Sequence, residues 1–198
     1  MWRGMNVSFR DMLFLLVFAY LVIGAVALAH VRKQQQETSG ATPPGSVIVE
    51  LHWDDKIDAD VDLWVQAPGD VPVGYSNKSG VVFNLLRDDL GHSGDPLSMN
   101  YEIAYGRGIF AGEYTVNAHL YRSADHRFPI PVHATVSVHD PQDHVRRILE
   151  STAELKFQGQ EITIFRFKLE KDGSLVAGSL NRIHKPLRSA QVSPGSKQ

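Results

Sequence analysis

The chain has 198 residues, of which 43% are hydrophobic and 21% are charged, and its formal net charge is -2. This length leaves room for one domain of ordinary size beside one apolar segment near the N-terminus. The small net charge gives no electrostatic reason to expect a nucleic-acid partner. The absence of cysteine excludes disulfides, thiolate nucleophiles and cysteine-based zinc sites.

Residues 12–29 form an uncharged run, MLFLLVFAYLVIGAVALA. Eighteen helical residues at about 1.5 Å each cover about 27 Å, enough to cross a thin hydrocarbon core. We therefore expect a transmembrane helix over residues 12–30, preceded by an arm of residues 1–11. The alternative is a cleaved signal peptide, because Ala27-Leu28-Ala29 has the form of a cleavage site. The apolar part of a signal peptide has about 7–15 residues, so the length favours a retained anchor.

The residues that open this run carry a family resemblance. Residues 5–16, MNVSFRDMLFLL, resemble the start of the single helix of the ExbD/TolR family and, more loosely, of MotB. In those families an aspartate opens the helix and takes part in proton flow through a multi-helix partner of the ExbB/TolQ/MotA kind. The resemblance implies this role for Asp11. It also implies a homodimer through the helix, a cytoplasmic N-terminus and a domain beyond the bacterial inner membrane, in the periplasm or outside the cell.

The residues themselves leave two interpretations of Asp11 open. A carboxyl group at the edge of the hydrocarbon can exchange a proton, as a relay requires. Alternatively, Asp11 caps the helix by accepting hydrogen bonds from N–H groups of the first turn, or it pairs with Arg10 at the interface.

Residues 31–45, VRKQQQETSGATPPG, are polar and show no apolar period, which predicts a flexible linker. Period-two alternation then predicts a series of strands, at 47–53, 61–65, 114–120, 132–138 and 163–169. The region 144–155 is ambiguous between helix and strand. We expect seven or eight strands in an antiparallel β-sandwich over residues 46–178, a mainly β fold. The polar residues 179–198 predict a mobile tail.

Part of this domain has a resemblance of its own. Residues 53–65, WDDKIDADVDLWV, with Pro68-Gly69 and Tyr75-Ser76-Asn77 after them, are similar to YfaP-like sandwich domains of bacterial surface and secreted proteins. The stretch from Gly112 to Val116 matches their Gly-x-Tyr-x-Val strand. Residues 87–95 stand where those domains have a glycine-rich acidic turn, and they depart from its Gly-Pro-Glu form.

Aspartates are concentrated near the start of the domain, within nine residues: Asp54, Asp55, Asp58, Asp60 and Asp62. Calcium takes about six to eight oxygen ligands, and closely spaced aspartates on a loop can supply several of them. The sequence therefore raises a calcium site as a hypothesis, without the spacing of an EF-hand. The alternative is a solvated loop that continues into the polar face of a strand, where Asp60 and Asp62 discourage edge-to-edge pairing.

No catalytic motif is present, whether Gly-x-Ser-x-Gly, His-Glu-x-x-His or a phosphate-binding loop. His119, His133 and His139 fall on polar strand faces and are interpreted as surface residues. We therefore expect no enzyme and no cofactor besides calcium. Two functions are consistent with the sequence. One is an ExbD/TolR/MotB-like component of a proton-driven envelope complex. The other is a membrane-tethered module that binds an envelope protein or glycan, with no role in proton transfer.

Overall fold

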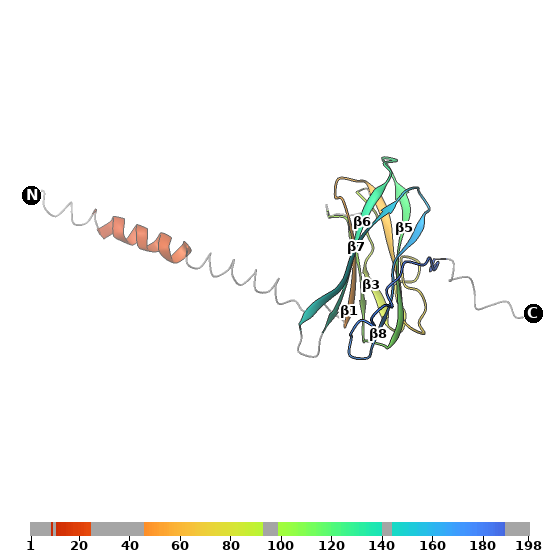
Figure 1. The fold of residues 1–198 in the computed structure, drawn as a ribbon. Coiled ribbons are helices and arrows are strands. Elements are labelled where there is room, and N and C mark those ends of the chain that lie inside the picture. The colour runs from red at the N-terminus through yellow and green to blue at the C-terminus, as the bar shows by residue number, and fades with distance from the viewer. Residues whose placement is uncertain (1–8, 10, 25–45, 93–98, 140–143, 189–198) are drawn as a thin grey trace, which may run out of the picture. The chain divides into compact units, whose positions relative to one another are not determined.

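The computed structural model describes residues 9, 11–24, 46–92, 99–139 and 144–188. The chain divides into two units, Met1–Pro43 and Pro44–Gln198. The described part of the first unit is a helix, and the second unit is a β domain (Figure 1).

The helix includes residue 9 and residues 11–24. Within the described ranges, no helix is both long enough and apolar enough to cross a membrane. Residues 25–30 of the span expected from the sequence, and the linker at 31–45, lie outside the described residues.

The β domain has eight strands in two antiparallel sheets that face each other across the core (Figure 1). The strands are β1 (Val47–Trp53), β2 (Ala59–Gln66), β3 (Phe83–Arg87), β4 (Tyr101–Gly106), β5 (Gly112–Ser123), β6 (Ile130–His139), β7 (Val145–Leu155) and β8 (Glu161–Leu169). Sheet A has the order β3-β4-β1-β6-β7, and sheet B has the order β2-β5-β8. The mainly β class and the expected number of strands are confirmed. The ambiguous region at 144–155 is a strand, because it pairs with β6 along its length.

The core follows the period-two alternation of the sequence. One face of β1 is buried against sheet B, through Val47, Val49, Leu51 and Trp53. The facing side chains of sheet B include Val61, Leu63, Tyr114 and Phe167. Burying one large apolar side chain contributes about 1.5–3 kcal/mol, so this alternation supplies much of the stability of the domain.

The alternation is inverted in β4, which the sequence patterns did not reveal as a strand. Its larger side chains, Tyr101, Ile103 and Tyr105, are half-buried, whereas Glu102, Ala104 and Gly106 are buried. Two of these buried positions are small, and the third is a carboxylate. Apolar periodicity cannot identify such a strand, because the signal depends on large apolar residues at buried positions.

The folded domain extends beyond the expected end at residue 178. We call residues 179–188 the C-terminal strap. Asn181 and Arg166 of β8 exchange two backbone hydrogen bonds of 2.8 Å, and Leu187 is fully buried. The side-chain amide of Asn117 donates to the carbonyl of Lys185 at 2.8 Å. The strap therefore covers polar residues on the outer face of sheet B, and residues 189–198 of the expected tail lie outside the described residues.

We expect Leu187→Ala to lower the free energy of unfolding by about 2–5 kcal/mol, because it removes a buried side chain and leaves a cavity. Leu180→Ala is the matched control, since Leu180 lies in the same strap and is 47% exposed. The measurement is the cooperative melt of a fragment of residues 46–198, followed by far-UV circular dichroism. A strand-rich spectrum is expected, and equal melting temperatures for the two variants would contradict the packing of the strap.

Candidate functional site

A fully buried carboxylate joins the two sheets beside β2, an edge strand of sheet B. Oε2 of Glu102, on β4, accepts a hydrogen bond from the backbone N–H of Leu63 on β2 at 2.6 Å. Oε1 accepts one from the N–H of Asp89 at 3.1 Å. Since an unpaired buried N–H is costly, Glu102 supplies the partner of the Leu63 N–H on the side of β2 where sheet B has no further strand.

An acidic pocket lies next to this contact. It has a volume of about 190 Å³ and is lined by Asp60, Asp62, Tyr75, Asp88, Leu90 and Tyr121. We call it the acid pocket. Asp60 and Asp62 project from the outer face of β2, opposite to Val61 and Leu63, because side chains alternate along a strand. The pocket therefore combines neighbouring aspartates of β2 with residues that are distant in sequence.

The loop after β2 closes one side of the acid pocket. Trp64 is fully buried on the outer face of β2, and Tyr75 meets its ring edge-on at a centroid distance of 5.6 Å. A Cβ atom at Gly74 would lie 2.4 Å from the Trp64 ring, so glycine is required at this close approach. The glycine thus allows the loop to bring Tyr75 over β2.

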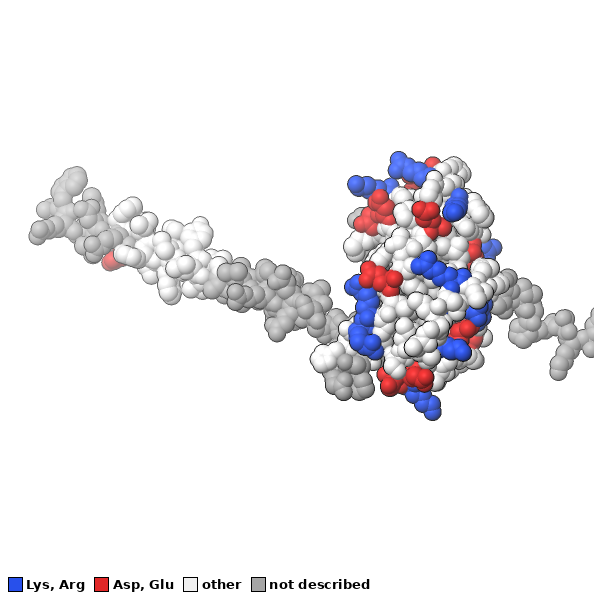
Figure 2. Space-filling model, viewed as in Figure 1, with Lys and Arg blue, Asp and Glu red and all other residues white. Residues whose placement is uncertain are grey.

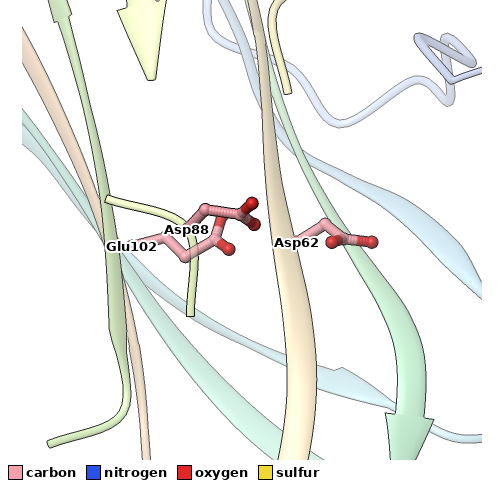
Figure 3. Close-up of side chains that lie close together, drawn as sticks. All are labelled: Asp62, Asp88 and Glu102. Atoms are coloured by element: carbon pink, nitrogen blue, oxygen red, sulfur yellow. The ribbon is translucent and has the colours of Figure 1, made fainter. Parts of the chain in front are cut away.

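Three carboxylates lie close together at this site, on three separate segments (Figure 3). One oxygen from each of Asp62, Asp88 and Glu102 lies within 4.8 Å of the others. Asp88 also pairs with Lys78 through Oδ2, at 2.8 Å. Oδ1 of Asp88 and Oδ1 of Asp60 are buried and have no hydrogen-bond partner among the described residues.

A histidine holds Asp62 from the side of the C-terminal strap. Nδ1 of His119 lies 2.6 Å from Oδ2 of Asp62, and Arg188 contacts Nε2 of the same ring. His119 therefore holds the Asp62 carboxylate in place, and Arg188 holds the other side of the imidazole ring.

Burial and neighbouring charges raise the pKa values of three carboxyl groups at this site. Burial, together with the negative charges of Asp62 and Asp88, raises the pKa of Asp60 from 3.8 to about 7. Burial also raises the pKa of Asp62, although the hydrogen bond with His119 acts in the opposite direction. Burial raises the pKa of Glu102 well above its ordinary value. Desolvation and like charges disfavour the ionised forms, so the site favours either protons or a cation.

The five aspartates proposed as calcium ligands are not all brought together. Asp54 is exposed and accepts the N–H of Lys56 in a turn, at 3.0 Å. Asp55 accepts the N–H of Asn100 at 2.8 Å and so fastens the β1–β2 loop to the segment before β4. The carboxylates of these two aspartates accept hydrogen bonds from loop backbone, and neither lines the acid pocket.

Asp58 also has a structural role outside the acid pocket. Its Oδ1 accepts the N–H of His92 at 3.2 Å and pairs with Arg122 at 3.4 Å. Only Asp60 and Asp62 of the predicted five line the pocket, and both are buried. The alternative of a solvated polar face therefore does not describe these two residues.

The three histidines that the sequence placed on polar strand faces differ in burial. His119 is buried and paired with Asp62, which differs from its interpretation as a surface residue. His133 is partly exposed and lies 3.1 Å from Glu150 on β7. His139 is half-buried at the end of β6.

Two residues of the site, Asp88 and Glu102, were absent from the predicted ligands. Glu102 offered a weak signal, since it is a charged residue beside Ile103 and Ala104 at a buried position of a strand. Asp88 stands in the stretch where the chain departs from the acidic turn of YfaP-like domains. Neither signal reveals that the carboxylates of Asp88 and Glu102 lie beside β2. That position depends on how distant segments of the chain pair with one another.

We expect Asp60 to make stability depend on pH in the presence of a chelator. A folded-state pKa above the unfolded value means that the folded protein binds the proton more tightly. Its stabilising contribution is present at pH 4 and is lost as pH rises through about 7. A change from 3.8 to about 7 corresponds to about 4 kcal/mol.

The measurement is the free energy of unfolding of the full chain in detergent from pH 4 to pH 8. Relative to Asp60→Asn, the wild-type protein should lose about 4 kcal/mol of unfolding free energy across this range, because the folded state gives up its more tightly bound proton. Asp125→Asn, in an exposed turn, is the control and should follow the wild-type curve. A curve for Asp60→Asn that runs parallel to the wild-type curve would contradict the prediction.

Comparison with known proteins finds no matching family model, no matching curated protein and no matching solved structure.

Proposed function

We propose that the protein is a membrane-tethered β-sandwich binding module of the bacterial envelope. In this proposal residues 12–30 anchor the chain in the inner membrane with the N-terminus in the cytoplasm. The domain is then presented on the other side, where it binds an envelope protein or a glycan. The observation that carries the proposal is a helix that has no polar face.

The large side chains of residues 12–18 are all apolar and exposed. Seven consecutive residues make about two helical turns, so these side chains cover every face of the helix. A helix that is apolar all round requires an apolar environment. The sequence continues this apolar run through residue 29, which supports a lipid bilayer as that environment.

The β domain does not need the helix to complete its core. Every member of its buried apolar cluster lies between Val47 and Leu169. Figure 2 shows acidic and basic side chains over the visible face of the domain, whereas the described part of the helix is almost free of them. This division of charge supports a water-exposed module on a lipid anchor.

The acid pocket is the most site-like feature of the described part of the domain. It combines buried carboxylates with Tyr75 and with Tyr121, which is 53% exposed. An exposed tyrosine beside polar groups can contact both apolar and hydroxyl-bearing ligands. This pairing supports recognition of an envelope protein or glycan at the pocket.

We expect the full chain to sediment with membranes and to stay there in alkaline carbonate, because the apolar helix is held in lipid. Removal of residues 1–30 should release the domain in soluble form. The measurement is immunodetection in both fractions, with protease accessibility in spheroplasts to place the domain. A full chain found in the soluble fraction would contradict the anchor.

A second function, an ExbD/TolR/MotB-like component of a proton-driven complex, is favoured by the position of Asp11. Asp11 has helical backbone, and so does Phe9 two residues before it. An aspartate in the first turn of a helix can also accept hydrogen bonds from N–H groups of that turn, so the capping interpretation stays open beside the relay. A carboxylate within an apolar helix supports the proton-relay hypothesis.

Asp11→Asn tests this second function, because asparagine keeps the shape of aspartate and cannot titrate. We expect the variant to reach normal abundance and to copurify with a multi-helix partner in mild detergent. It should fail to complement a deletion strain. Asp125→Asn, a change of the same kind in the β domain, is the control. Full complementation by Asp11→Asn would leave only the tethered module.

A further inference from the structure

We propose that the acid pocket is a binding site for a divalent cation of the calcium class, held by Asp60, Asp62, Asp88 and Glu102. The inference goes beyond the tethered module, and it holds whether or not the helix lies in a membrane. It differs from the calcium hypothesis drawn from the sequence, because half of these ligands come from distant segments.

Two buried carboxylate oxygens point to a ligand independently of the cluster itself. Asp60 is 7% exposed, lines the pocket and has an Oδ1 without a hydrogen-bond partner among the described residues. Oδ1 of Asp88 is also buried and has no hydrogen-bond partner among the described residues. Most buried polar atoms in folded proteins have a partner, and a bound cation would be the partner of both of these oxygens.

The charge balance favours the same ligand. Arg87 pairs with Asp89, and Lys78 pairs with Asp88, which leaves Glu102 without an ion pair among those the structure records in its described part. The positive charges of Arg122 and Arg188 act on Asp60 and Asp62, but Arg122 is shared with Asp58 and Arg188 contacts the ring of His119. Buried carboxylates without matching positive charge are costly, and a dication compensates several at once.

The ligand atoms select the class of ion. The pocket offers carboxylate oxygens, and the ring of His119 is already engaged on both nitrogens, by Asp62 and Arg188. An oxygen-only set suits calcium, magnesium or manganese and disfavours zinc.

The number of carboxylates favours calcium. Calcium takes about six to eight oxygen ligands, whereas magnesium is usually held by about one or two carboxylates and keeps several waters. Asp62, Asp88 and Glu102 alone offer three carboxylate oxygens within 4.8 Å of one another, close enough to share one ion. The volume of about 190 Å³ leaves room for water molecules that would complete the coordination.

A bound cation would connect the two sheets. Asp60 and Asp62 belong to β2 of sheet B, Glu102 belongs to β4 of sheet A, and Asp88 directly follows β3. The ion would therefore stabilise the edge of the sandwich that Glu102 already joins. It would also fix the segment carrying Asp88 and Leu90 at the mouth of the pocket.

The test is calorimetric titration of calcium chloride into the full chain in detergent, after the protein has been stripped with a chelator and the chelator removed. We expect one calcium ion per chain, with a Kd of about 1 mM or tighter, and a rise in melting temperature. Magnesium chloride and zinc chloride should bind at least about tenfold more weakly. Asp60→Asn should weaken calcium binding at least about tenfold, because it removes a charged ligand.

Asp54→Asn is the matched control. It changes an aspartate of the same acidic stretch that lies outside the pocket, and it should keep the wild-type Kd. Asp60→Asn should melt no lower than the wild-type protein without calcium, since it removes charge repulsion. If Asp60 had only a structural role, Asp60→Asn would lower the melting temperature without calcium as well as with it.

Asp88→Asn provides a second variant if Asp60→Asn does not fold, because Asp88 is more exposed than Asp60. It should weaken calcium binding to the same extent. The proposal is overturned if calcium does not bind the wild-type chain, in which case the carboxyl groups hold protons instead. It is also overturned if Asp54→Asn weakens binding as much as the pocket variants do.

Discussion

The contact between Glu102 and the backbone of β2 is the interaction on which the rest of the site depends. Sheet B has three strands and sheet A has five, so β2 is an edge strand that lies beside β4. Glu102 accepts the N–H of Leu63 from across the sandwich, and the backbone of Val73 pairs with Val65 further along the same edge. An acidic group is thereby fixed in the interior, and the neighbouring carboxylates must be compensated around it.

The surrounding structure supplies that compensation through backbone N–H groups and through basic side chains that are shared among several acids. Asp89 is held by the N–H groups of Gly91 and Tyr101 and by Arg87. The C-terminal strap brings Arg188 to His119, which orients Asp62. Most of these contacts are hydrogen bonds that fix the positions of the carboxylates. The acid pocket is consequently a place where protonation or cation binding changes the stability of the domain.

The helix and the domain follow different physical rules. Side chains of the helix are apolar on every face, so its sequence suits an apolar surrounding better than water. Apolar side chains of the domain alternate with polar ones and are buried between two sheets. This contrast is the basis for the proposed tethered module, and Asp11, a carboxylate within the helix, is the basis for the proposed second function.

The sequence by itself determined the mainly β class and most of the strands, because large apolar residues at alternating positions mark the buried faces of β1, β2, β5, β6 and β8. Of the five aspartates that the sequence suggested as calcium ligands, Asp60 and Asp62 line the acid pocket. Only the tertiary structure revealed β4, whose buried positions hold Glu102, Ala104 and Gly106. The register of distant strands decided that Asp88 and Glu102 join β2 while Asp54 and Asp55 serve the loops. Local patterns report which face a residue occupies, whereas a site is formed by pairing between segments that no local pattern records.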